Sequence, residues 1–183
     1  MSAKYKAIEI ANFYIQLANS IEDDSIDNLK INKILYFAQG RALAKTGQPL
    51  FDDEFEAWDY GPVVPAVYHA YKCCGKNVIE QAIDTFDETR LSSEEIDILT
   101  DVYLYYGKYT GLALKEITHE KGTPWTQVYV RGENCLIGKD LIKDYFIAND
   151  KVKSLEINDS ENNIIRAVPL DWDSEGDSVY GGV

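Results

Sequence analysis

Histidine and cysteine side chains are the residues with which this sequence could hold a metal ion or build a nucleophile. His69 and Cys73 are four positions apart, so on a helix they would share a face, as paired zinc ligands do. Cys74 would point about 100° away from Cys73 on that helix. His119 and Cys135 could complete the site of a metal-dependent hydrolase only if the fold brought them together. We instead interpret the adjacent cysteines as small packing residues near a helix end.

The motifs of the common enzyme classes are missing from the sequence. It contains no G-x-x-x-x-G-K-[ST], G-x-G-x-x-G, G-x-S-x-G or H-E-x-x-H segment, and it has only two histidines. The sequence shows no pair of carboxylates in contrasting surroundings that would separate their pKa values, as acid–base catalysis requires. His119 is interpreted as a residue at a helix C-terminus, where a histidine suits exposed carbonyl groups. The residues therefore predict a protein that is not an enzyme and uses no metal or cofactor.

The charge of the chain restricts its partners. With 18 basic and 31 acidic residues among 183, the net charge is 18 − 31 = −13. This balance opposes direct DNA binding and contact with an anionic membrane surface, and it favours a basic protein partner. Three cysteines form no even framework of disulfides, and no run of about 18 apolar residues is present. We therefore expect a cytoplasmic protein that binds another protein.

Apolar residues recur at helical spacing along most of the first 150 residues. Ser25 or Asp27 can begin the second helix and Gly47 can end it. Ser92 and Glu95 form a capping box before a later helix. The expected fold is mainly α, a compact domain of about six helices with a small β element. The expected helical segments are 4–19, 25–47, 65–75, 92–106, 111–119, a short turn from 123, and 138–150.

The stretch EAWDYGPVVPAVYHAY, residues 56–71, mixes strand, turn and helix signals. Phe55 to Trp58 is short, aromatic and bounded by turn residues, which predicts a strand near 54–58. Pro62 marks a turn, and Pro65 fits the first turn of a helix, where its missing N–H costs nothing. We expect Trp58 to be largely buried, so that Trp58→Ala would cost roughly 3–5 kcal/mol.

The character of the sequence changes after residue 150. Two β-rich runs, KSLEI and NIIRAV, flank the polar loop NDSEN and predict a hairpin near 153–168. Seven acidic residues and one basic residue between 155 and 183 give 1 − 7 = −6, which is typical of a segment that stays solvated or orders on a partner. We therefore expect a domain at 1–150 and an acidic extension at 151–183, comprising the hairpin and a flexible tail.

Several short segments, taken together in their order and spacing, resemble one protein family. They are KILYFAQ (33–39), PLF (49–51), EAW (56–58), YGPV (60–63) with a second proline at 65, LKEITH (114–119), PW (124–125) and IKDYF (142–146). This set is similar to the Panacea domain, the SocA-like, phage-associated family of antitoxins, over about residues 4–148. The chain departs from the family pattern at Arg41-Ala42, where members often carry Trp-His, and at Lys115, a position that is usually Ser or Thr. An insertion also lengthens the 118–124 segment.

The resemblance implies an antitoxin that neutralises a cognate toxin by direct binding and has no enzymatic activity. It leaves open an alternative, a proteolysis adaptor that delivers the toxin to a bacterial protease. The candidate partner-binding residues are Asp59, Tyr60, His69, Lys72, Trp125, Asp171, Trp172 and Asp173. The candidate structural residues of the motifs are Tyr36, Gln39, Trp58, Gly61, Pro62, Pro65, His119 and Pro124.

Overall fold

The computed structural model describes residues 4–22 and 24–152, and these belong to one compact unit that ends at Val152. The predicted hairpin near 153–168 lies outside the described residues. So do three of the candidate partner-binding residues, Asp171, Trp172 and Asp173. What is predicted for these positions stays a prediction.

The described residues form a mainly α fold with one small sheet, which confirms the expected fold class. The α-helices are α1 (Ala7–Asn19), α2 (Asn28–Thr46), α3 (Pro65–Ala70), α4 (Ser93–Tyr106), α5 (Gly111–Thr118), α6 (Pro124–Val128) and α7 (Lys139–Asn149). The 3₁₀-helices are η1 (Lys72–Cys74) and η2 (Glu88–Arg90), and the strands are β1 (Phe55–Trp58), β2 (Gly61–Val63) and β3 (Cys135–Ile137). Within these described elements, no helix is both long and apolar enough to cross a membrane.

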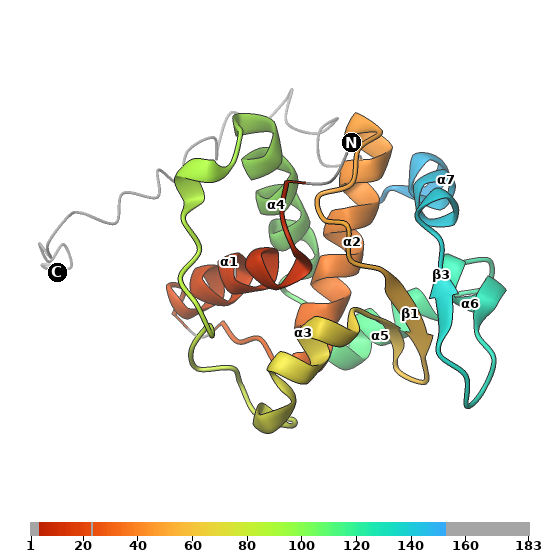
Figure 1. The fold of residues 1–183 in the computed structure, drawn as a ribbon, viewed down its shortest axis with the longest axis horizontal. Helices are drawn as coiled ribbons and strands as arrows, with labels where there is room; N and C mark the ends of the chain where they lie inside the picture. The colour runs from red at the N-terminus through yellow and green to blue at the C-terminus, as the bar shows by residue number, and fades with distance from the viewer. Residues whose placement is uncertain (1–3, 23, 153–183) are drawn as a thin grey trace, which may run out of the picture. The chain divides into compact units, whose positions relative to one another are not determined.

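Helix α2 is the centre of the fold. Every residue from 30 to 43 is buried, and the helix contacts α1, α4, α5 and α7. In Figure 1 it runs between α1 and α4 on one side and α7 with the sheet on the other. Asp27 caps its first turn by accepting from the Lys30 N–H, and Gly47 ends it in the left-handed conformation. Of the two residues predicted to begin this helix, the structure selects Asp27.

A buried arginine ties α2 to two other parts of the fold. Arg41 is 2% exposed, and its guanidinium contacts Asp101 of α4 at 2.8 Å and Asp150 after α7 at 2.7 Å. The two carboxylates help to compensate for removing the guanidinium from water. This arginine is one of the positions that depart from the family pattern. In this protein, the arginine at that position forms ion pairs with Asp101 and Asp150.

Strand β1 lies between β2 and β3 and is antiparallel to both. The strand predicted near 54–58 is therefore confirmed. The strands β2 and β3 carry no periodic signal in the sequence because each is only three residues long. Pro62 is tolerated within β2 because an edge strand leaves one side of its backbone without ladder bonds. Trp58 pairs with Gly61, so Asp59 and Tyr60 form a two-residue turn.

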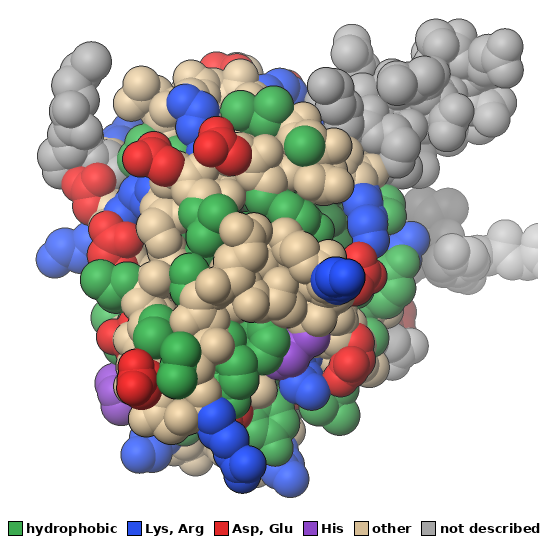
Figure 2. Space-filling model, turned by 90° about the vertical axis from the view of Figure 1, so that its right-hand side faces the viewer, with side chains coloured by type: hydrophobic (Ala, Val, Ile, Leu, Met, Phe, Trp, Pro, Cys, Tyr) green, Lys and Arg blue, Asp and Glu red, His purple; other side chains and the backbone are tan. Residues whose placement is uncertain are grey.

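The face formed by α6, β3 and α7 is mixed in character. Figure 2 turns this side of the molecule toward the viewer and shows hydrophobic side chains exposed among groups of both charges. Leu136 of β3 and Ile147 of α7 are 60% and 53% exposed. Apolar side chains that are exposed singly in this way do not by themselves mark a binding site.

Candidate functional site

The turn between β1 and β2 presses closely against α2 and α5. Gly61 has a φ of +95°, in the region that glycine adopts more readily than other residues. A Cβ atom at this position would lie 2.7 Å from Thr118 Oγ1 and 2.8 Å from Lys33 Cε. Glycine is therefore required here both by the backbone conformation and by the close approach of the turn to the side chains beneath it.

A stack of aromatic rings supports this turn from α5 and α6. The rings of His119 and Trp125 have centroids 3.6 Å apart, and Trp125 stacks on Tyr129 at 4.2 Å. The Trp125 indole donates to the Trp58 carbonyl oxygen at 2.9 Å, and the Tyr129 hydroxyl donates to the Asp59 carboxylate at 2.7 Å. These bonds hold both the backbone of the turn and its acidic side chain.

His119 has the surroundings of a structural histidine. It is the C-cap residue of α5, which confirms the interpretation of a histidine at a helix C-terminus. Its Nδ1 lies 2.7 Å from the Lys115 carbonyl oxygen, and its Nε2 lies 3.3 Å from the Asp59 carbonyl oxygen. Burial lowers the pKa of His119 below its ordinary value, so the ring is neutral at pH 7. A neutral imidazole has one N–H, so it donates to one of the two carbonyls at a time.

A groove opens between this turn and the first half of α2, and we call it the hairpin groove. Its volume is about 480 Å³, within the range of pockets that hold small ligands. Its walls carry aromatic rings, and charged residues of both signs line it. The residues that line it are Asn28, Leu29, Asn32, Lys33, Trp58, Asp59, Tyr60, Val63, Tyr68, Lys72, Gly75, Lys76, Gly132, Glu133 and Asn134.

Lys33 is the most perturbed cation of the hairpin groove. The residue is fully buried, and its Nζ donates to the Pro62 carbonyl oxygen at 2.9 Å. Burial lowers the pKa of its ammonium group to about 7, and the charge of Asp27 opposes this shift. Near pH 7 the protein therefore holds Lys33 in both its charged and its neutral form.

Of the candidate partner-binding residues that the structure describes, four are exposed and one is buried. Asp59, Tyr60 and Lys72 are exposed and line the hairpin groove, and Tyr60 is 60% exposed. His69 is exposed on α3, beside the groove residue Tyr68. Trp125 is only 7% exposed, so it supports the turn from inside the protein and offers little surface to a partner.

Trp58 departs from what the sequence predicts. Its exposure is intermediate, whereas we expected it to be largely buried. One face of its ring packs against Tyr68, with centroids 4.8 Å apart, while the open hairpin groove lies alongside. Its indole N–H donates to the Glu56 carboxylate at 2.7 Å. Trp58 is therefore a wall of the groove as well as a packing residue.

The remaining motif residues have structural surroundings. Gln39 is fully buried, donates to the Phe51 carbonyl oxygen at 2.8 Å and accepts from the Leu50 N–H at 2.9 Å. It thereby fixes the loop that leads into β1. Tyr36 is buried among aromatic rings, and its hydroxyl has no hydrogen-bond partner among the described residues. Pro65 and Pro124 each begin a helix, α3 and α6 respectively, as the sequence predicts for both.

The histidines and cysteines do not assemble a metal site. Within residues 4–22 and 24–152, no group of three or more His, Cys, Asp or Glu side chains is placed to hold a metal ion. The Sγ atoms of Cys73 and Cys74 lie 4.0 Å apart, and both cysteines are free. In this part of the chain, His69, Cys73, Cys74, His119 and Cys135 therefore do not come together as the ligand set that the hydrolase alternative needs.

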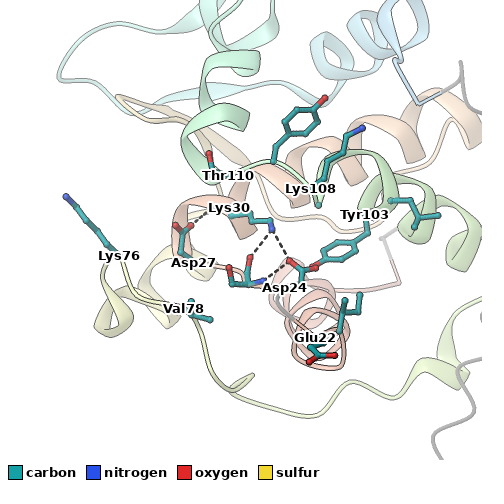
Figure 3. Close-up of a pocket in the computed structure, with 15 residues that line it drawn as sticks. Glu22, Asp24, Asp27, Lys30, Lys76, Val78, Tyr103, Lys108 and Thr110 are labelled. Atoms are coloured by element: carbon teal, nitrogen blue, oxygen red, sulfur yellow. Dashed lines mark hydrogen bonds and ion pairs between the residues drawn. The ribbon is translucent and has the colours of Figure 1, made fainter. Parts of the chain in front are cut away.

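A second hollow, of about 630 Å³, lies between the start of α2 and the end of α4. Figure 3 shows that three of its polar side chains, Asp24, Lys30 and Tyr103, point toward one another. Lys30 lies 3.3 Å from the Asp24 carboxylate, and Tyr103 donates its hydroxyl proton to the other oxygen of Asp24. Lys30 Nζ also donates to the Ser25 carbonyl oxygen at 2.8 Å. The buried cation of this hollow is thus already neutralised from within the chain.

Sequence reasoning does not single out several residues of the hairpin groove. Lys33 does carry a signal, because it is a charged residue inside the apolar run of a helix that is apolar on more than one face. Asn28 and Asn32 lie four positions apart at the start of α2, and Asn32 accepts from the Val64 N–H at 3.0 Å. The contacts of these asparagines with residues around Pro65 depend on how the hairpin packs, so the sequence does not predict them.

Comparison with known proteins assigns the family. Residues 31–126, more than half of the chain, match the family described as "Antitoxin SocA-like, Panacea domain". The chain is also 34% identical over 152 residues to Antitoxin SocA of Caulobacter vibrioides (strain NA1000 / CB15N), covering 75% of this chain and 80% of that protein. No solved structure matches the chain. The chain therefore belongs to the SocA-like Panacea family of antitoxins, as the motifs imply.

Proposed function

We propose that this protein is the antitoxin of a bacterial or phage toxin–antitoxin system and that it neutralises its toxin by direct binding at the hairpin groove. One observation carries the proposal. Family segments that are far apart in the sequence, those that contain Lys33, Trp58, Tyr60 and Trp125, converge on this one groove and its support. Membership of an antitoxin family supports a toxin as the partner.

The chemistry of the groove suits a protein partner. Exposed tyrosine and half-buried tryptophan are the side chains that most often anchor protein interfaces. Tyr60 is 60% exposed on a turn whose backbone is held by Trp125, so little backbone freedom is lost when a partner covers this turn. We therefore assign the binding of the toxin to a preformed surface, and no reaction is required of it.

The experiment is co-expression with the product of the adjacent open reading frame in a bacterial host. We expect that product to be toxic alone and harmless together with this protein. Tyr60→Ala should abolish the rescue, whereas Leu104→Ala should preserve it. Leu104 is a matched control because it is 62% exposed and lines the second hollow instead. A harmless neighbour, or full rescue by Tyr60→Ala at equal protein level, would contradict the proposal.

The proteolysis adaptor is a distinct outcome of the same binding step. An adaptor would shorten the life of the toxin, while simple neutralisation would leave it unchanged or lengthen it. The half-life of the toxin, measured with and without this protein in cells with and without the host protease, separates the two. We favour neutralisation by binding, because it requires only the contact with the toxin, whereas an adaptor also requires a contact with the protease.

A further inference from the structure

Other buried cations of the described chain are paired with carboxylates. Lys30 is 7% exposed and lies 3.3 Å from Asp24. Arg41 is 2% exposed and contacts both Asp101 and Asp150. Pairing of this kind is expected, since a charge that is removed from water is costly unless a counter-charge compensates for it. Lys33 does not follow this pattern.

Lys33 is 0% exposed and, among the described residues, no carboxylate lies within ion-pair distance of its Nζ. Its hydrogen-bond acceptor in that part of the chain is the Pro62 carbonyl oxygen, at 2.9 Å. A lysine ammonium carries three N–H groups, so two of them have no acceptor there. Burial lowers the pKa of Lys33 to about 7, and the charge of Asp27 only partly opposes this shift. A carboxylate brought near Lys33 would supply both the charge and the acceptors.

The hairpin groove around Lys33 differs in charge from the rest of the molecule. Three lysines line it, Lys33, Lys72 and Lys76, against the two acidic residues Asp59 and Glu133. The whole chain, by contrast, has a net charge of −13. This groove is therefore a place where an otherwise acidic protein favours a negatively charged group.

We propose that the hairpin groove receives an acidic side chain of the toxin, which pairs with Lys33 between the walls formed by Trp58 and Tyr60. The inference rests on the proposed function and names the chemistry of its contact. The lysine side chain can turn its ammonium group from the Pro62 carbonyl oxygen toward the groove, because its four-carbon stem is flexible. Tyr60, which is 60% exposed, can move aside and then cover the pair from water.

The test is a double-mutant cycle between this protein and the product of the adjacent open reading frame, measured by titration calorimetry. Lys33→Met keeps an unbranched side chain that is shorter by one heavy atom, and it removes the charge. We expect it to weaken binding at least about tenfold, while Lys108→Met, an exposed lysine of the second hollow, leaves affinity unchanged. One Asp→Asn or Glu→Gln change in the toxin should weaken binding to the wild type by a similar factor and leave binding to Lys33→Met unaffected.

The outcomes separate the two proposals. If the wild type does not bind the neighbouring product, the proposed function fails and this inference fails with it. If the wild type binds and the folded Lys33→Met variant binds equally well, only this inference is overturned. The same holds if no carboxylate of the toxin is coupled to Lys33, because the groove then receives some other group.

A second variant guards against a folding defect at the buried position. Lys72→Met combined with Lys76→Met changes two exposed residues and leaves Lys33 in place. We expect this variant to lower the association rate several-fold at low salt, and the difference from the wild type to shrink as salt is added. An association rate equal to that of the wild type at low salt would show that Lys72 and Lys76 attract no acidic group of the toxin.

Discussion

Lys30 and Lys33 lie within one turn of the same helix, and both are buried, yet their surroundings are different. Lys30 faces Asp24 and the Ser25 carbonyl oxygen, whereas Lys33 faces the Pro62 carbonyl oxygen alone among the described residues. The first arrangement is complete within the chain. In the second, no carboxylate of the described residues contacts the ammonium group, so a partner could supply one.

The charge of Lys33 should make stability depend on pH. The unfolded chain keeps this proton up to about pH 10.5, while the folded chain releases it above about pH 7. Between these values the unfolded state binds more protons, so the free energy of unfolding should rise with pH, by up to about 1.4 kcal/mol per unit. Urea denaturation of the wild type between pH 7 and 8.5 should show this rise relative to Lys33→Met. Parallel curves for the two proteins would mean that Lys33 is not desolvated as described.

The two tryptophans beside the turn should differ in their effect on stability. Trp58 is partly exposed on the groove wall, so Trp58→Ala should lower the free energy of unfolding by about 1–3 kcal/mol. Trp125 is buried and bonded to the Trp58 carbonyl oxygen, so Trp125→Ala should cost about 3–5 kcal/mol. Chemical denaturation of both variants checks the order. An equal or reversed order would contradict the assignment of Trp58 to the groove.

At the scale of elements, the β1–β2 hairpin is the part that creates the site. Its two-residue turn places Asp59 and Tyr60 above the junction of α2, α5 and α6. Because the turn is bonded from below by Trp125 and Tyr129, a small hairpin acquires a fixed position on a helical core. The sheet itself is short, so its position depends on these contacts more than on its own ladder.

Gly61→Ala should destabilise the protein for two reasons, the positive φ and a steric clash of the new Cβ. Gly122→Ala is a matched variant that has only the first of them. Gly61 and Gly122 both have positive φ, +95° and +88°, but a Cβ would collide with Thr118 and Lys33 only at Gly61. We expect Gly61→Ala to destabilise the protein by about 2–4 kcal/mol and Gly122→Ala by about 1–2 kcal/mol. Thermal and urea unfolding of the two variants compare these costs. Equal losses would show that the turn can lift away from the helices freely.

The sequence indicates much of the fold and less of the site. Helix ends are predictable because Asp27, Gly47 and the Ser92–Glu95 box act through local hydrogen bonds. The three-residue strands are not, since neither period nor composition marks them. The groove also escapes prediction, because its lining comes from segments more than 100 positions apart, such as Asn28 and Glu133, that only the packed core brings together.

At the scale of the molecule, the compact unit continues beyond the end of its last helix, α7. Asp150 pairs with Arg41 of α2, and Val152 is 1% exposed. Both residues follow α7, which ends at Asn149. The compact unit therefore continues to Val152, two residues past the end of the domain expected at 1–150.

Two truncations should therefore behave differently. A chain that ends after Val152 should unfold at the same urea concentration as the full chain. A chain that ends after Asn149 should be less stable by about 2–4 kcal/mol, since it removes the Asp150 carboxylate from Arg41 and the buried side chain of Val152 from the core. Urea denaturation of the two chains decides this. Equal stability would mean that Asp150 and Val152 contribute little.

The longer of these truncated chains also tests the acidic extension. We predict that residues 155–183 contribute to the choice of partner through their net charge of −6. The chain that ends after Val152 should then remain folded and neutralise the toxin less well in the co-expression assay. Undiminished rescue would show that these residues are dispensable.

The burial of the central part of α2 has a consequence for amide hydrogen exchange. Residues 30–43 lie inside the core on every side, so their amides should exchange with deuterium only when the whole unit opens. The amides of the exposed Asp59–Tyr60 turn, by contrast, should exchange through local motion. One deuterium-labelling experiment on the free and toxin-bound protein can thus report global stability from α2 and occupancy of the hairpin groove from the turn, in the same sample.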